Sequence, residues 1–311
     1  MLERFGLVKY HMTPKEFTDR LEAISRDNGV LYGRLRALEA AKLQHVMDSS
    51  RYKGFDALVN AWKCFFLETV EQFNSFIRPQ VKDQLPFSYA LLLERLALYF
   101  SGLNAAEIVA TQGYPLQAYT LLRNVFDSVV LCSAVAQGLT DFPKLEGVED
   151  GKEFDPAIFQ KLRRKEERKI RPMMTGEASG LSAETASQLA KWDVLFDHET
   201  HGGLLSRAFS ADWLRGTQPL PVMPQFLEDR YAMYLNRYCE IAWMVHRLLP
   251  LIQPRGIPLG ADWKSKWRTL DESFLETAKA LTVQMGKPIG AAIVELVEMK
   301  FPFNADATFW A

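Results

Sequence analysis

Apolar residues recur every three or four positions along almost the whole chain, and a sustained alternation of apolar and polar residues is not evident. This spacing predicts helices over about 14–27, 30–48, 54–78, 83–110, 114–138, 155–174, 182–201, 225–249, 262–285 and 289–300. The sequence therefore predicts an all-α fold, a multi-helix bundle of about ten helices with no significant sheet.

Two segments interrupt the helical pattern. Residues 139–156 hold acidic residues, Gly and Pro, and residues 213–224 hold three prolines within six positions. A helix interior does not tolerate such segments, so both are predicted to be loops. They suggest an N-terminal helical bundle (1–140) and a C-terminal helical region (141–311) that packs on it. One continuous domain is the alternative.

The segment 113–138 is almost wholly apolar and carries two charges, Arg123 and Asp127. A helix that is apolar all round is expected at the centre of a bundle, where charges must be paired. We therefore expect an i,i+4 ion pair, with Glu94 and Arg95 in a similar apolar setting. In the functional alternative, Arg123 faces a cleft and binds a small anionic ligand, because guanidinium recognises phosphate and carboxylate well.

A second polar cluster lies in the segment KWDVLFDHETHGG. Asp193, Asp197 and His201 are spaced by four residues, so they share one stripe of a helix. A carboxylate one turn away raises the pKa of a histidine, which suits a general base. The structural alternative is a helix end capped by the glycines that follow. His198 could join Asp197 and His201 around a metal ion, but HExxH and ExxH are absent, so we predict neither a metal site nor a cofactor.

A dense basic run follows the first predicted loop. It consists of Lys161, Arg163, Arg164, Lys165, Arg168, Lys169 and Arg171, broken by Glu166 and Glu167. Such a run suits contacts with nucleic-acid phosphates. The alternative is a solvated surface helix, neutralised by the acidic residues before it (Glu146, Glu149, Asp150, Glu153 and Asp155), and no aromatic residue within the run is available to stack on bases.

Composition narrows the choice of function. The chain has 311 residues, with 37 basic and 38 acidic side chains, so binding to a polyanion needs a local patch. No signal sequence and no run of 18 uncharged apolar residues is present, so we expect a cytoplasmic protein without a membrane span. We expect the three cysteines (Cys64, Cys132 and Cys239) to be buried reduced thiols, and His45 and His246 to be packed in or beside the core.

The segments LLRNVFDSV and KWDVLFDHETHGG together resemble an uncharacterised family of bacterial all-helical proteins, a domain of unknown function. Its members have a central LLR helix with an acidic residue one turn on, and a later helix that ends in His-Gly. Here these positions are Arg123, Asp127, His201 and Gly202.

That family distantly resembles the HEPN superfamily of helical nucleotide-binding and ribonuclease domains, found in toxin–antitoxin and phage-defence systems. The resemblance implies a dimer interface at which a histidine acts as base or acid and an arginine steadies the phosphate. In the HEPN pattern an Arg is followed by a polar residue and then, four to six positions on, by a His. Only Arg4 and His11 have a suitable spacing, and they lie outside any predicted core helix. A ribonuclease site would therefore require Arg123 and His201 to meet in space.

Our leading interpretation is a homodimeric regulatory or ligand-binding bundle with a polar site around Arg123 and His201. Asp127, Asp193, Asp197 and His198 are its predicted ligand-binding residues, and a small anionic ligand or RNA is the expected partner. The first alternative is a metal-independent ribonuclease in which His201 is the general base and Arg123 stabilises the transition-state charge. The second is a nucleic-acid-binding module that uses the basic helix 161–171.

Overall fold

The structure, a computed structural model, describes residues 13–27, 29–48, 50–80, 87–136, 138–147, 155–175, 228–254 and 256–285. This part of the chain is all-α and contains no strand. Its eight long helices are α1 (Pro14–Asp27), α2 (Gly29–Asp48), α3 (Ser50–Ile77), α4 (Phe87–Thr111), α5 (Pro115–Ala136), α7 (Pro156–Thr175), α10 (Glu228–Ile252) and α11 (Ala261–Met285). A 3-10 turn, η2 (Arg78–Gln80), follows α3, and a single helical turn, α6 (Phe142–Leu145), precedes α7.

The predicted all-α class is confirmed, while the predicted count of about ten helices is not. The predicted helices 182–201 and 289–300 and the predicted loop 213–224 lie outside the described residues. One prediction was wrong in detail, because α6 lies within the predicted loop 139–156. Asp141 caps this turn by accepting a hydrogen bond from the backbone N–H of Lys144 at 2.9 Å, and Pro143 suits its start.

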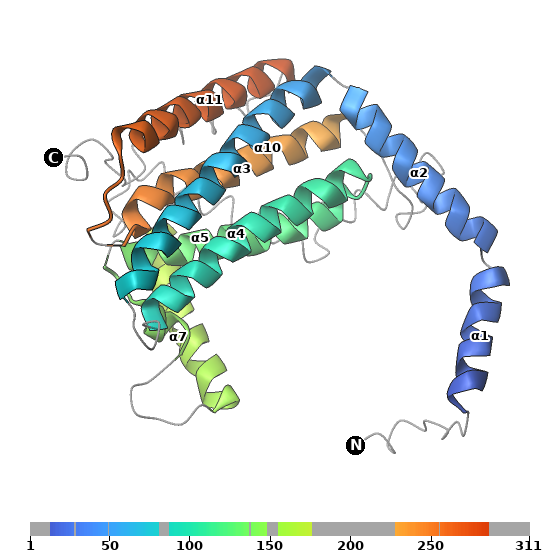
Figure 1. Cartoon of the computed structure of the whole chain (residues 1–311), viewed down its shortest axis with the longest axis horizontal. Helices are drawn as coiled ribbons and strands as arrows, with labels where there is room; N and C mark the ends of the chain where they lie inside the picture. Colours follow the sequence, from blue (N-terminus) through green and yellow to red (C-terminus); the bar gives the residue numbers. More distant parts are fainter. Residues whose placement is uncertain are drawn as a thin grey trace.

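The centre of the molecule is an antiparallel pair, α4 and α5, that packs against α10 (Figure 1). The turn between α4 and α5 is sharp because Gly113 adopts a positive φ of 95°. The N–H of Tyr114 reaches back to the carbonyl of Val109 at 3.1 Å and closes the end of α4. Helix α3 packs against α4 and α11, and α11 also packs on α10, so α10 and α11 join the core built by the earlier helices. The predicted division near residue 140 stays a prediction.

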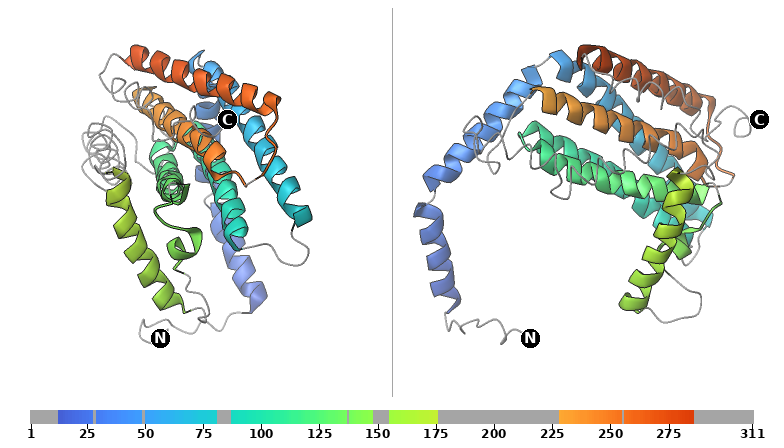
Figure 2. Two further views of the ribbon diagram at one scale, coloured as in Figure 1. Left: turned by 90° about the vertical axis from the view of Figure 1, so that its left-hand side faces the viewer. Right: turned by 180° about the vertical axis from the view of Figure 1, so that it is seen from behind.

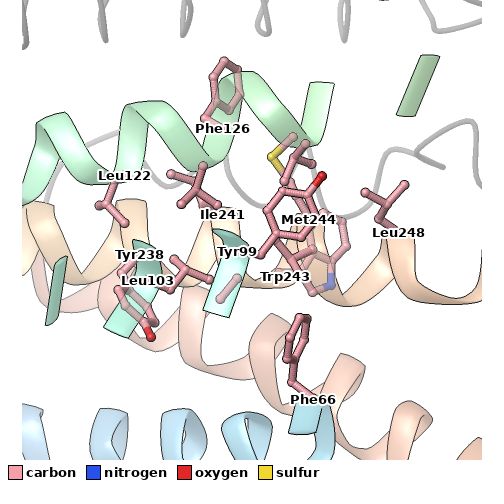
Figure 3. Close-up of a cluster of buried hydrophobic side chains, with 14 of the residues drawn as sticks. Phe66, Tyr99, Leu103, Leu122, Phe126, Tyr238, Ile241, Trp243, Met244 and Leu248 are labelled. Atoms are coloured by element: carbon pink, nitrogen blue, oxygen red, sulfur yellow. The ribbon is translucent and has the colours of Figure 1, made fainter. Parts of the chain in front are cut away.

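The core is rich in large aromatic side chains. Trp62, Tyr99, Phe126, Tyr234 and Trp263 are each at most 2% exposed. Figure 3 shows part of this core, where residues of α4 and α5 gather around Ile241 and Met244 of α10. Burial of many such side chains supplies the main driving force for this fold.

Close packing of α4 on α5 depends on Gly102. A Cβ atom at this position would lie 2.6 Å from Cγ2 of Val125. Glycine thus allows the two helices to approach more closely than any other residue would.

The N-terminal helices form an arm. In both figures α2 leaves the end of the bundle and α1 continues away from it (Figure 1, Figure 2). The arm is attached where the hydroxyl of Tyr114 donates a 2.8 Å hydrogen bond to the buried Glu39 of α2. Most other positions of α2 whose side chains are described are exposed, including Leu38, Leu43 and Met47.

One stretch of the described helices, Gln117–Ala136, is long and apolar enough to cross a membrane by length and composition. Within the structure, 67% of its apolar window is buried. A helix at the centre of a bundle meets the same criterion, so this stretch is weak evidence for a membrane span.

Candidate functional site

The predicted ion pair between Arg123 and Asp127 is confirmed. Nε of Arg123 lies 2.9 Å from Oδ2 of Asp127, one turn along α5. The guanidinium also lies over the ring of Phe126, 5.8 Å from its centroid. The side chain of Arg123 is 9% exposed and that of Asp127 is 32% exposed, so the pair lies at the edge of the core. The arginine charge is therefore balanced where it is buried.

Helix α5 is not buried all round, in contrast to the expectation from its apolar sequence. Gln117, Thr120 and Asn124 are exposed, and Asp127 is half-buried on the same face. These positions are three or four residues apart, so they form a polar stripe on a helix that is otherwise packed. The carboxylate of Asp127 therefore reaches solvent while its arginine partner does not.

Glu94 and Arg95 do not pair with each other. Arg95 forms a salt bridge with Glu146, which follows α6, whereas Glu94 is exposed. No local sequence pattern predicts this pair, because its members are 51 residues apart.

The second polar cluster lies outside the described residues. This applies to Asp193, Asp197, His198 and His201. The meeting of Arg123 with His201, on which the anion site and the ribonuclease site both depend, stays a prediction. Among the residues that the structure does describe, no group of three or more His, Cys, Asp or Glu side chains could hold a metal ion.

The basic run lies on α7, which points away from the layers formed by α3, α4 and α5 (Figure 1). Positive and negative side chains lie on different sides of this helix. Five cations are exposed, and their spacing of three or four residues places them on one side of the helix. We call this side the outer face; its residues are Lys161, Arg164, Lys165, Arg168 and Lys169. Arg171 belongs to the same helix, but its side chain is outside the described set.

The inner side of α7 holds both acidic residues of the helix and its packing contacts. Ile170 is fully buried, and Glu166 accepts a 2.8 Å hydrogen bond from the hydroxyl of Thr140. Glu167 pairs with Arg163 at 2.8 Å, and Arg163 in turn lies 4.0 Å from Glu146. The carboxylates of Glu166 and Glu167 therefore both form contacts at the inner side of the helix or at its flanks.

The described acidic residues before α7 do not neutralise the outer face. Glu146 pairs with Arg95, and Asp155 accepts hydrogen bonds from the N–H groups of Ala157 and Ile158, so it caps the helix. Glu149, Asp150 and Glu153 are not among the described residues. Within the described ranges, the outer face makes one ion pair, from Lys169 to Glu166 at 3.6 Å.

The expectations for the lone cysteines and histidines are met in part. Cys132, Cys239 and His246 are buried as predicted, and burial raises the pKa of Cys132 to about 11. Cys64 is exposed, and so is His45 on the arm, which corrects both predictions. Both predictions relied on the apolar residues next to Cys64 and His45 in the sequence. Residues adjacent in sequence point to different sides of a helix, so apolar neighbours do not show that a residue is buried.

Comparisons with known proteins add no further constraint on the site. The chain matches no protein-family model, no curated protein and no solved structure.

Proposed function

We propose that the protein binds the phosphate backbone of a nucleic acid through the outer face of α7. The observation that carries this proposal is the sorting of charge on that helix, with exposed cations on one side and both acidic residues in contacts at the other side and its flanks. Glu166 also lies 3.6 Å from Lys169, which is the one outer-face cation with an acidic partner among the described residues. A solvated surface helix usually intersperses charges of both signs, which allows i,i+4 pairs. Here the outer face keeps its positive charge.

Most cations of the outer face have no ion-pair partner among the described residues, which supports the same proposal. Within the described residues, Lys161, Arg164, Lys165 and Arg168 form no ion pair or side-chain hydrogen bond. Like charges one turn apart repel each other, so this arrangement destabilises the free helix slightly. Anionic phosphates would relieve that repulsion and release counterions.

The net charge of −1 is compatible with this function, because the cations are concentrated locally. Helix α7 contains seven basic residues, from Lys161 to Arg171, and two acidic ones. A local patch of this kind suffices for backbone contacts, which carry no sequence information.

The test measures binding of short labelled DNA and RNA by fluorescence anisotropy from about 50 to about 200 mM salt. If all five cations contact phosphates, log K falls against log salt with a slope of about −4.5. The double substitution Arg164→Glu/Arg168→Glu should abolish most of the affinity.

A matched control carries the same change of charge away from α7. Arg34→Glu/Arg268→Glu alters exposed arginines of α2 and α11, and it should leave affinity nearly unchanged. Equal losses for the two double variants would show that only overall charge matters, and absence of binding to any oligonucleotide would refute the proposal.

A further inference from the structure

We infer that the nucleic acid bound by α7 is double-stranded B-form DNA, with the helix lying in the major groove. This inference rests on the proposed function and specifies its partner. It comes from the arrangement of the five cations within the outer face.

The cations form two rows along the helix. Lys161, Lys165 and Lys169 follow one another at intervals of four residues, and Arg164 and Arg168 form a second row beside them. With 3.6 residues per turn, neighbouring members of the two rows are turned from each other by roughly 60–100° about the helix axis. Long side chains in such rows therefore diverge by this angle across the outer face rather than pointing along a single line.

Two diverging rows fit two phosphate backbones. The major groove of B-form DNA is about 12 Å wide and admits an α-helix, whose diameter with side chains is about 10–12 Å. A helix in that groove has one backbone on each side, so lysines would reach one strand and arginines the other. The Lys161 to Lys169 row spans about 12 Å along the axis, which is enough for several successive phosphates.

Other nucleic acids fit this surface less well. Single strands are bound mainly by stacking of bases on aromatic residues, and the segment from Lys161 to Arg171 contains none. The major groove of A-form RNA is too narrow for side chains to read. The position of the helix leaves room for a duplex as well, because the start of α7 projects from the bundle (Figure 2), whereas Ile170 near its other end is buried in the core.

The experiment compares one sequence as duplex DNA, duplex RNA and separate single strands, at the same salt concentration. We expect duplex DNA to bind at least tenfold more tightly than the others. Two variants then remove one row each, Arg164→Gln/Arg168→Gln and Lys161→Gln/Lys165→Gln/Lys169→Gln. Each should weaken binding to duplex DNA by on the order of tenfold or more, since every lost phosphate contact removes a share of the counterion release. Circular dichroism checks that α7 stays folded in both variants.

The outcomes separate the two proposals. Equal or tighter binding of single strands or duplex RNA overturns the groove inference but leaves phosphate binding by α7 intact. A row variant that binds duplex DNA as tightly as the wild type also overturns the groove inference, because one row of cations would then be enough for binding. No salt-dependent binding of any of the probes overturns the proposed function itself. Tighter binding to vesicles that contain anionic lipid than to duplex DNA would assign the outer face to a membrane surface and overturn both.

Discussion

His246 and Trp267 exchange hydrogen bonds across the interface of α10 and α11. Nε2 of His246 donates to the carbonyl oxygen of Trp267 at 2.9 Å, and the indole N–H of Trp267 donates to the carbonyl of His246 at 3.1 Å. The two rings are stacked, with centroids 5.1 Å apart. Nδ1 of the imidazole is buried and has no hydrogen-bond partner among the described residues, so the ring is held in its neutral form.

We predict that this histidine makes the protein acid-sensitive. Burial, followed by the nearby charge of Arg247, lowers the pKa of His246 from 6.5 to about 3, although its bond to Trp267 opposes the shift. The unfolded chain therefore binds a proton below pH 6.5 that the folded chain does not, and stability falls as the pH drops from 6.5 toward 3. The loss approaches about 5 kcal/mol at the acidic end. Denaturant unfolding at several pH values should show a shallower acid dependence for His246→Gln than for the wild type, and parallel curves would contradict the prediction.

Replacement of Gly102 by alanine should destabilise the protein by about 1–3 kcal/mol. The new methyl group would collide with Val125, whose branched side chain is stiff at χ1. Gly54→Ala is the control, because nothing lies within 4 Å of a Cβ at that position in α3. The control should gain about 0.5–1 kcal/mol from helix propensity. Chemical denaturation of both variants measures the difference, and a gain at both positions would argue against the tight contact of α4 with α5.

Asp271 of α11 binds two residues of α10. It accepts hydrogen bonds from Nε of Arg247 at 2.6 Å and from the indole of Trp243 at 2.9 Å. Asp271→Ala would leave a mostly buried guanidinium without this partner and should cost about 2–4 kcal/mol, somewhat less than a fully buried pair. Arg247→Leu/Asp271→Leu should recover much of that loss in thermal unfolding. A double variant as unstable as the single one would show that the charges themselves hold α10 to α11.

Helix positions could be predicted from the sequence more fully than their contacts. The ends of α1, α2 and α11 lie within one residue of their predicted limits, because apolar periodicity and the caps around Thr13 are local signals. Contacts such as that between Trp263 and Thr69 join residues 194 positions apart, which periodicity cannot reveal. For α7, the sequence indicated a basic helix but not which side is exposed. That side depends on the packing of Ile170 and on the partners of Glu166.

The ribonuclease interpretation makes a prediction that needs no assumption about the fold around His201. If His201 is a general base and Arg123 stabilises the developing phosphorane charge, the purified wild type should cleave RNA in the presence of EDTA. His201→Ala should then lose cleavage while keeping the helical circular dichroism and thermal stability of the wild type. Gel analysis of labelled RNA measures this. No cleavage of any RNA by the wild type would leave Arg123 with its structural role.

The Arg123–Asp127 pair should be coupled more strongly than an exposed pair with the same spacing. A double-mutant cycle with Arg123→Met and Asp127→Ala isolates the coupling between the two residues, whatever other contacts each one makes. We expect a coupling of about 1–2 kcal/mol, because the guanidinium is only 9% exposed and is weakly screened by solvent. Arg163 and Glu167 provide a matched pair with the same spacing and an Nε contact of 2.8 Å, but with side chains 40% and 31% exposed. Their coupling should be about 0.3–0.5 kcal/mol. Equal couplings would mean that solvent screens Arg123 as well as it screens Arg163, and that the pair in α5 is an ordinary surface contact.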